Sequence, residues 1–420
     1  MKTPRHDILN DKVRGVKQVE SFIKDRLVSA FSVLFESFYI KEHGLFREAI
    51  GNPKPGDPPF AYNWSFGALL TAFAALLESG AVTDHPMRES WENTLASAND
   101  RYLTLTRGLF GYDSYIDQKN PVRYYDDNAW IGLASLRLFE QTGRAAWIQR
   151  AVIAYQFVRD GWDHASDGVF WRESPRRSLH VCSAGPGALL AGQLYSHTRE
   201  EEQLDCARRW FAWTLKLRNA DGVFQDNLNP ETGVIEPKTF TYNQGTPLHA
   251  ALVLHEQTGD AAYRVEAERI LRAANHFLQP EDRSEDAEGR SNDAEDRSED
   301  AEDRSNDAED RSEDAEDRSE DGGRTVDGVR GETPRLPRTI WFNAVLLRAV
   351  AAAARRGLSA DGLIAAYDRE LAAAWDAYSG VRPLVGAMAL DSPPGRLPLL
   401  DAAGTMEMAA TRAEAATSTP

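Results

Sequence analysis

A short phrase, Gly followed by Leu or Val and then Phe, recurs along this chain at a nearly fixed interval. Its copies begin at Gly44, Gly108, Gly168 and Gly222, which are separated by 64, 60 and 54 residues. A fifth copy, Gly328-Val329, lacks the Phe and follows after 106 residues, or after 65 once a 41-residue acidic tract is subtracted. A fixed period of this size, filled with helical pattern, indicates a repeated helix-pair architecture. We expect each Gly to end a helix and turn the chain, and the Phe to anchor the loop that follows.

Two kinds of helix are expected to alternate between these loops. Helices of one kind are apolar nearly all round and belong in the interior: Phe66 to Leu77, Ala129 to Phe139, Ala188 to Leu194, Leu248 to Leu254 and Trp341 to Ala354. Helices of the other kind are amphipathic and charged and belong outside: 145–160, 200–218 and 260–278. With 360–378 and 399–415 as the final pair, the pattern predicts an all-α fold, an (α/α)6 barrel. A helical solenoid gives the same alternation, but the polar and aromatic loop residues favour closure around a site.

The acidic tract, residues 281–321, repeats a seven-residue unit similar to Glu-Asp-Arg-Ser-Glu-Asp-Ala. No position of this heptad carries a large apolar residue, so it does not form a coiled coil. The tract is highly charged and almost free of hydrophobic residues, and we expect it to be a disordered insert. Residues 1–280 and 322–415 then form a single catalytic domain, and 416–420 form a C-terminal tail. The unit lacks the glycine and the ligand spacing of an EF-hand loop, which argues against specific calcium binding.

Charge and composition narrow the class of protein. The net charge of −17 comes mostly from the tract, which holds 21 acidic residues and 6 arginines, so the remainder carries only −2. No basic surface for nucleic acid is therefore expected. Cys182 and Cys206 form no CxxC motif, and neither a metal site nor a disulfide framework is predicted. No membrane-spanning run and no signal peptide are evident, so we expect a cytoplasmic protein that does not bind membranes. We also expect no cofactor.

The stretch Tyr124-Tyr125-Asp126-Asp127-Asn128-Ala129-Trp130 contains the only Asp-Asp pair of the chain and opens an apolar helix. Two adjacent carboxylates repel each other, so the pKa of one should rise while that of the other stays low. Glycoside cleavage needs this division, because one group donates a proton and the other remains anionic. The flanking aromatic side chains offer flat faces for a sugar ring. In the alternative interpretation the aspartates only cap the helix.

The loops that precede the inner helices should meet at one end of a toroid. They are rich in amides, hydroxyls and indoles: Tyr62-Asn63-Trp64-Ser65, Ser183-Ala184-Gly185-Pro186 and Tyr242-Asn243-Gln244-Gly245-Thr246. This composition is typical of a carbohydrate-binding cleft, although Asn, Ser and Asp are also common helix caps. Asp226, just past Gly222, is expected on the same side as Asp126, where its alternative role is to form a turn.

Other chemistries find little support in the sequence. It contains no HExxH, no P-loop, no GxGxxG after a strand and no Gly-x-Ser-x-Gly elbow. Nine histidines are scattered, and none is expected among the funnel motifs. Sugar epimerases of this shape rely on histidines, which argues against an epimerase but leaves it as an alternative. Unsaturated uronyl hydrolases need cationic groups to bind a substrate carboxylate, and the funnel motifs have few such groups.

The Asp126-Asp127-Asn128-Ala129-Trp130 motif, followed by Tyr242-Asn243-Gln244-Gly245, resembles glycoside hydrolase family 76, the α-1,6-mannanases. The resemblance covers nearly the whole chain outside the acidic tract. It implies an (α/α)6 barrel that cleaves α-1,6-mannosidic bonds with retention or transfers the glycan, with Asp126 as the nucleophile and Asp127 as the acid/base. We expect substrate contacts from the aromatic and polar residues of the funnel: Trp64, Tyr125, Asn128, Trp130, Asp226, Tyr242, Asn243 and Gln244.

The sequence therefore predicts a retaining, endo-acting α-1,6-mannosidase that needs no metal and acts on a mannan-type oligosaccharide or polysaccharide. Neighbouring residues at a helix start can hold their carboxyl groups roughly 5–5.5 Å apart, the distance typical of retaining enzymes. Two alternatives remain open: another (α/α)6 carbohydrate-active enzyme, such as a sugar epimerase or an unsaturated uronyl hydrolase, and a non-catalytic glycan-binding protein.

Overall fold

The computed structural model describes residues 23–52, 56–116, 118, 121–278, 336–337, 339–377 and 396–417. The predicted insert at 281–321, the fifth Gly phrase at Gly328-Val329 and residues 418–420 of the predicted tail lie outside the described residues. The boundaries proposed for the single catalytic domain therefore stay predictions.

Two classes of helix alternate along the described part of the chain and form two concentric rings. The inner ring is built from α2 (Asn63–Glu78), α4 (Tyr125–Thr142), α6 (Val181–Thr198), α8 (Thr241–Thr258), α11 (Ile340–Arg355) and α14 (Leu399–Thr417). Each of these helices contacts the next, and α14 contacts α2, so the ring closes. The predicted (α/α)6 barrel is confirmed, and the closed ring excludes an open solenoid.

The outer ring is formed by the helical residues 23–38 and by α3 (Arg88–Asp100), α5 (Ala145–Asp160), α7 (Glu201–Thr214), α9 (Ala261–Ala273) and α12 (Asp361–Ala377). The helix α5 contacts both α4 and α6, α7 contacts both α6 and α8, and α12 contacts both α11 and α14. Each of these outer helices therefore lies over the seam between two inner ones. Short 3-10 turns, η1 (Leu215–Leu217) and η2 (Ala274–Phe277), follow α7 and α9. None of the described helices is long and apolar enough to cross a membrane.

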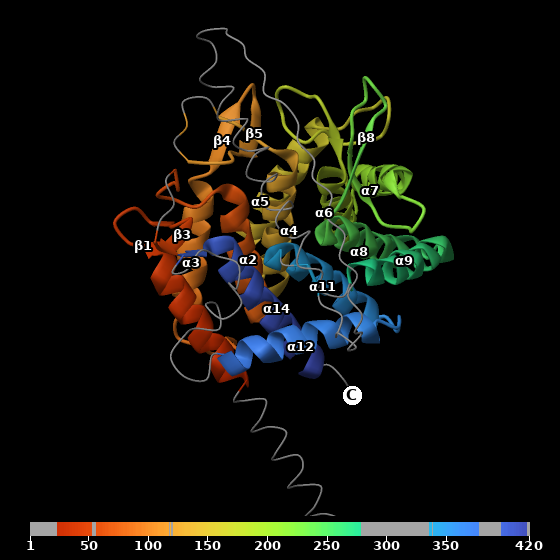
Figure 1. The fold of residues 1–420 in the computed structure, drawn as a ribbon. Helices are drawn as coiled ribbons and strands as arrows, with labels where there is room; N and C mark the ends of the chain where they lie inside the picture. Colours follow the sequence, from red (N-terminus) through yellow and green to blue (C-terminus); the bar gives the residue numbers. More distant parts are fainter. Residues whose placement is uncertain are drawn as a thin grey trace, which may run out of the picture.

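Short antiparallel strands occupy the connections that run from an outer helix to the next inner helix. The described strands are β1 (Tyr39–Ile40), β2 (Leu45–Phe46), β3 (Ala49–Gly51), β4 (Leu103–Thr106), β5 (Leu109–Tyr112), β6 (Leu179–His180), β7 (Gln225–Leu228), β8 (Ile235–Thr239) and β9 (Arg396–Pro398). Strand β3 pairs with β9, with Ile50 opposite Leu397, and β6, β7 and β8 form one sheet. These pairings tie neighbouring connections together at the end of the barrel where the inner helices begin. Figure 1 shows β4, β5 and β8 at this same end.

The Gly phrases turn these connections and do not end helices, so that part of the prediction is wrong. Gly44, Gly108 and Gly222 have φ of +67°, +78° and +82°, and they lie in turns beside β2, β5 and β7. Such left-handed φ values favour glycine because it has no Cβ. At Gly168 the reason is space, since a Cβ there would lie 2.7 Å from Cε2 of Trp213.

The left-handed helix ends lie at the opposite end of the barrel. Gly143, Arg199 and Gly259 follow α4, α6 and α8 directly and have φ of +68°, +59° and +69°. Each begins a short connection from an inner to an outer helix, which is the place where the helix-ending Gly should have been sought. The Phe of the phrase also varies, because Phe46 is fully buried whereas Phe110 is 48% exposed.

The inner helices are apolar all round because they pack against both rings. Glycine allows the closest approaches between them: a Cβ at Gly245 of α8 would lie 2.8 Å from Cα of Leu346, and a Cβ at Gly404 of α14 would lie 2.8 Å from Cα of Trp341. Both contacts involve the backbone of α11, which cannot yield as a side chain can. One hydrophobic cluster extends from Leu27 to Ala410 and joins residues on both sides of the acidic tract.

A buried charge network connects four inner helices. Glu407 of α14 is fully buried, and its Oε1 lies 2.7 Å from Nη2 of Arg348 on α11 and 3.2 Å from Nη1 of Arg137 on α4. Arg137 also contacts Glu78 at the end of α2, with Nη2 to Oε2 at 2.6 Å. The network is neutral overall and fixes the last helix of the ring relative to three others.

Candidate active site

The first turns of the inner helices meet at a pocket, and they contribute to it in one register. The second residue of each of five inner helices lines the pocket: Trp64, Asp126, Cys182, Tyr242 and Trp341. All these helices begin at the same end of the ring, and a helical Cα–Cβ bond tilts toward the N-terminus. The equivalent position of successive repeats therefore faces the mouth of the barrel.

Other side chains complete the wall of this pocket. Trp130 lies four residues after Asp126, on the same face of α4 one turn further in. The remaining lining residues come from the connections and from α11: Trp171, His180, Asp226, Phe240 and Phe342. The pocket holds about 570 Å³ of empty space, including its open mouth.

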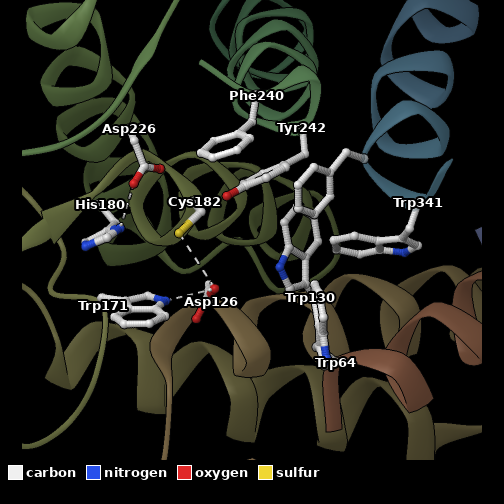
Figure 2. Close-up of a pocket in the computed structure, with 11 residues that line it drawn as sticks. Trp64, Asp126, Trp130, Trp171, His180, Cys182, Asp226, Phe240, Tyr242 and Trp341 are labelled. Atoms are coloured by element: carbon white, nitrogen blue, oxygen red, sulfur yellow. Dashed lines mark hydrogen bonds and ion pairs between the residues drawn. The ribbon is translucent and has the colours of Figure 1, made fainter. Parts of the chain in front are cut away.

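The pocket has a polar side and an aromatic side (Figure 2). Asp126, Trp171, His180, Cys182 and Asp226 form the polar side, whereas the other indoles, the Tyr242 phenol and the phenylalanine rings form the aromatic side. A pyranose ring has an apolar face, which suits the aromatic side of the pocket, and a rim of hydroxyl groups, which suits the polar side.

Asp126 is held on the polar side by two donors. Nε1 of Trp171 donates to its Oδ2 at 3.2 Å, and Sγ of Cys182 donates to the same oxygen at 3.6 Å. The Asp126 residue is 7% exposed, and it lies in the first turn of α4, where the helix dipole favours an anion. Burial, together with the charges of Asp126 and Asp226, raises the pKa of the Cys182 thiol well above its usual value.

Asp127 follows in the same helical turn but is fully buried and does not line the pocket. Successive residues of a helix are rotated by about 100°, so the two carboxyl groups leave α4 in different directions. The pair therefore places Asp126 in the pocket lining and Asp127 beside it in the same helical turn, with its side chain buried.

Asp226, at β7, faces the pocket beside His180, which immediately precedes α6. Asp226 accepts hydrogen bonds from Nδ2 of Asn243 at 3.1 Å and from Nδ2 of Asn227 at 3.0 Å. Nδ1 of His180 lies 3.7 Å from Oδ2 of Asp226, and Nε2 of the same ring lies 2.8 Å from Oγ of Ser178. The carboxylate and the imidazole are thus fixed as a pair.

The aromatic side is a cluster of perpendicular rings. Trp341 makes edge contacts with Trp130 at a centroid distance of 5.0 Å and with Trp64 at 6.0 Å. Tyr242 stacks on Phe240 at 5.4 Å and makes an edge contact with Trp130 at 6.5 Å. Trp130 is 5% exposed and Tyr242 is 9% exposed, whereas Trp64 is only partly buried. Trp64 therefore offers the most accessible of these three rings.

Four of the predicted contact residues lie outside the pocket lining: Tyr125, Asn128, Asn243 and Gln244. The hydroxyl of Tyr125 donates to Asp160 at 3.0 Å, and its ring packs against Phe157 of α5. These contacts lie on the outer side of α4. Burial is the main cause that raises the pKa of this phenol above its usual value. The role of Tyr125 as a sugar contact stays a prediction.

Two of the three amide side chains bond to backbone groups of neighbouring elements, and the third bonds to Asp226. Nδ2 of Asn128 donates to the carbonyl oxygen of Tyr112 at 2.9 Å, and its Oδ1 accepts from the Tyr112 N–H at 2.7 Å, which joins α4 to β5. Nε2 of Gln244 donates to the carbonyl oxygen of Ile270 at 2.9 Å and joins α8 to α9. Asn243 reaches the pocket indirectly, through its hydrogen bond to Asp226.

The expectation that no histidine belongs to the funnel is wrong, because His180 lines the pocket. The signal was the repeat register: His180 directly precedes an inner helix, as Tyr124 and Phe240 do. The argument against an epimerase that rested on histidines therefore fails. Trp171 carried no comparable signal, because it lies in an irregular connection far from Asp126 in sequence.

Among the described residues, no group of three or more His, Cys, Asp or Glu side chains is arranged to hold a metal ion. The chemistry that the described pocket offers is that of carboxyl groups, hydroxyl-binding groups and ring faces. A closed (α/α)6 ring whose pocket combines two aspartates with four indoles has the site of a carbohydrate-active enzyme.

Comparison with protein families identifies which carbohydrate-active enzyme this is. Residues 23–299 match the model of glycosyl hydrolase family 76. The chain belongs to this family and is a glycoside hydrolase. Family membership, rather than the count of histidines, decides against the epimerase and the non-catalytic alternatives. A comparison with curated protein sequences found no match.

Solved structures share the fold at low sequence identity. The glycoside hydrolase family 76 mannosidase Bt3792 from Bacteroides thetaiotaomicron superposes with a TM-score of 0.73 at 22% identity, over 94% of this chain and 98% of that chain. An inactive variant of an alpha-1,6-mannanase from Salegentibacter sp., with two adjacent Asp residues changed to Asn, was solved with alpha-1,6-mannotriose. It superposes with a TM-score of 0.63 at 20% identity, over 93% of this chain and 98% of that chain.

Proposed function

We propose that this glycoside hydrolase cleaves or transfers α-1,6-linked mannosides with retention, using Asp126 as the nucleophile and Asp127 as the acid/base. The observation that carries the proposal is the position of Asp126 at the pocket, with Asp127 in the same helical turn. The Salegentibacter alpha-1,6-mannanase lends support, because its inactive variant lacks two adjacent aspartates. This chain contains one such pair.

Retention follows from two displacements at the same carbon. In the first, a carboxylate oxygen of Asp126 bonds to the anomeric carbon as the bond to the glycosidic oxygen breaks, and Asp127 gives its proton to that departing oxygen. In the second, Asp127 takes a proton from water, or from a sugar hydroxyl in the transfer reaction. The oxygen so activated bonds to the anomeric carbon while the bond to Asp126 breaks.

The surroundings of the two carboxyl groups favour this division of roles. Asp126 accepts two hydrogen bonds at Oδ2, and these favour a carboxylate anion. Asp127 is fully buried beside that anion. Burial and a neighbouring negative charge both favour the protonated form of a carboxyl group, which is the form that a proton donor needs.

A neutral mannan chain suits the rest of the pocket. The indole faces of Trp64 and Trp130 can stack on sugar rings, and the fixed pair of Asp226 and His180 can bind hydroxyl groups. The alpha-1,6-mannotriose and alpha-1,6-mannotetrose complexes of the Salegentibacter enzyme support an α-1,6-linked oligosaccharide as the ligand.

The experiment measures hydrolysis of α-1,6-mannan and of α-1,6-mannotetraose, with α-1,2- and α-1,3-linked mannobiose for comparison. Proton NMR of the first product reports whether the α configuration is retained. We expect activity on the α-1,6 substrates, α products, and a loss of at least about 10³-fold in Asp126→Asn and Asp127→Asn. A β product first, or an enzyme indifferent to linkage, would contradict the proposal.

Asp226→Asn is the matched control, because it removes the other carboxyl group of the pocket. We expect it to weaken binding more than turnover, so that KM rises and kcat falls less than in the Asp126 and Asp127 variants. If Asp127→Asn kept its turnover while Asp226→Asn lost it, the acid/base role would belong to Asp226. Melting temperatures of the three variants separate these effects from unfolding.

A further inference from the structure

The connection between α5 and α6 wraps around the carboxyl group of Asp126. This connection supplies Trp171 from its middle and His180 from its end, and the first turn of α6 then supplies Cys182. In Figure 2 the indole nitrogen of Trp171 and the sulfur of Cys182 both point to Asp126. The two hydrogen bonds reach the same atom, Oδ2.

Trp171 is locked in place by contacts on its ring and on its backbone. Its ring stacks on His180 at a centroid distance of 5.2 Å, and it packs against Tyr124 at 4.8 Å. Its carbonyl oxygen accepts a hydrogen bond of 2.8 Å from the N–H of Tyr125, the first residue of α4. The indole N–H is therefore fixed relative to the helix that carries Asp126.

Cys182 is a donor of a different kind. The residue is 4% exposed, and its sulfur lies 3.6 Å from Oδ2 of Asp126. Burial raises the pKa of this thiol well above its usual value. The raised pKa favours the protonated thiol, which is the form that donates this hydrogen bond.

We infer that Trp171 and Cys182 are positioning residues that hold Oδ2 of Asp126 and so fix the orientation of the nucleophile's carboxylate. This inference rests on the proposed role of Asp126 as the nucleophile. Two donors on one oxygen fix the rotation of the carboxylate plane. They also stabilise the negative charge that returns to the carboxylate when the glycosyl-enzyme ester is hydrolysed.

The test uses Trp171→Phe and Cys182→Ala in the full-length enzyme. The Phe ring can keep the stack on His180 but lacks the N–H. Ala lacks the thiol and leaves only a small empty space in its place. Hydrogen bonds to charged groups are worth enough to predict a fall in kcat of about 10- to 100-fold for each variant, with KM changed by less than about threefold. The acidic limb of the kcat/KM profile should move to higher pH, because fewer donors favour the anion.

Two further variants serve as rescue and control. Cys182→Ser restores a donor and should recover part of the activity lost in Cys182→Ala. Cys206→Ala removes the other cysteine, which lies away from the pocket beside the hydroxyl of Tyr155 at 3.5 Å, and it should leave kcat and the pH profile unchanged.

The outcomes separate this inference from the proposed function. A wild-type enzyme that does not cleave α-1,6-mannan overturns the proposed function. A wild-type enzyme that cleaves it, with Trp171→Phe and Cys182→Ala at wild-type kcat and an unmoved acidic limb, overturns the positioning role alone. If Trp171→Phe loses its melting transition, Cys182→Ala decides by itself: a loss that Cys182→Ser does not relieve counts against the role.

Discussion

Asp113 carries a buried carboxyl group whose ionisation opposes folding at neutral pH. It follows β5, is 2% exposed, and accepts a hydrogen bond of 2.7 Å from Oγ1 of Thr104. Burial raises its pKa from 3.8 to about 6, against the opposing effects of the Thr104 hydrogen bond and the charge of Arg123. Asp113→Asn keeps the oxygen that Thr104 contacts and removes the charge, so we expect the variant to be more stable than the wild type near pH 7.

The magnitude follows from proton linkage. The unfolded chain releases the Asp113 proton near pH 3.8 and the folded protein near pH 6, so between these values the folded state holds more protons. The wild type therefore loses stability as pH rises through this window, and the whole penalty is present above it. At about 1.36 kcal/mol per pKa unit, the gap corresponds to at most about 3 kcal/mol.

Urea unfolding of the wild type and Asp113→Asn, at several pH values between about 4 and 7.5, measures this penalty. The free energy of unfolding of the variant minus that of the wild type should increase with pH by up to about 3 kcal/mol. Asp84→Asn, at an exposed position, is the control and should show a nearly constant difference. A difference for Asp113→Asn that is flat, or that shrinks as pH rises, would refute the reasoning.

Three further predictions concern the insert, the aromatic side of the pocket and the buried charges. Deletion of 281–321 should leave the melting temperature and kcat nearly unchanged, because the interval between Gly phrases returns to 65 residues without the tract. Doubling the length of a loop also costs only about 0.6 kcal/mol. A shortened protein that fails to fold would contradict this prediction. Trp64→Ala should raise KM with little change in the free energy of unfolding. Trp130→Ala should lower that free energy by about 3–5 kcal/mol, because the Trp130 ring is buried. Kinetics and urea unfolding of both variants measure these effects. Glu407→Ala leaves two buried arginines without their shared partner and should cost about 3–5 kcal/mol in urea unfolding, while Glu202→Ala, at an exposed ion pair, should cost less than about 1 kcal/mol.

The architecture could be predicted because it depends on periodic features of the sequence. The recurring Gly phrase revealed the helix pairs, and the all-round apolar helices marked the inner ring. The meaning of the glycines could not be predicted, because a glycine that ends a helix and one that turns a hairpin look alike in sequence. Gly108 and Gly143 both have positive φ, yet only Gly143 follows a helix directly.

Within the site, the sequence located the first turns of the inner helices, and the tertiary structure decided which residue of each turn faces the pocket. In α4 the order Tyr125, Asp126, Asp127, Asn128 offers four candidates, and rotation by about 100° per residue sends each in a different direction. Asp126 faces the pocket, Tyr125 packs on α5, and Asn128 bonds to β5. Only the closed ring defines which direction is inward.

Local sequence patterns could not predict which residues surround Asp126. The sequence by itself determined that an adjacent carboxyl pair opens a buried helix beside aromatic residues, because adjacency and helical period are local properties. Trp171 and Cys182 reach Oδ2 of Asp126 from 45 and 56 positions further along the chain. Their convergence depends on how the connection before α6 folds back over α4, and a single sequence carries no record of that long-range contact.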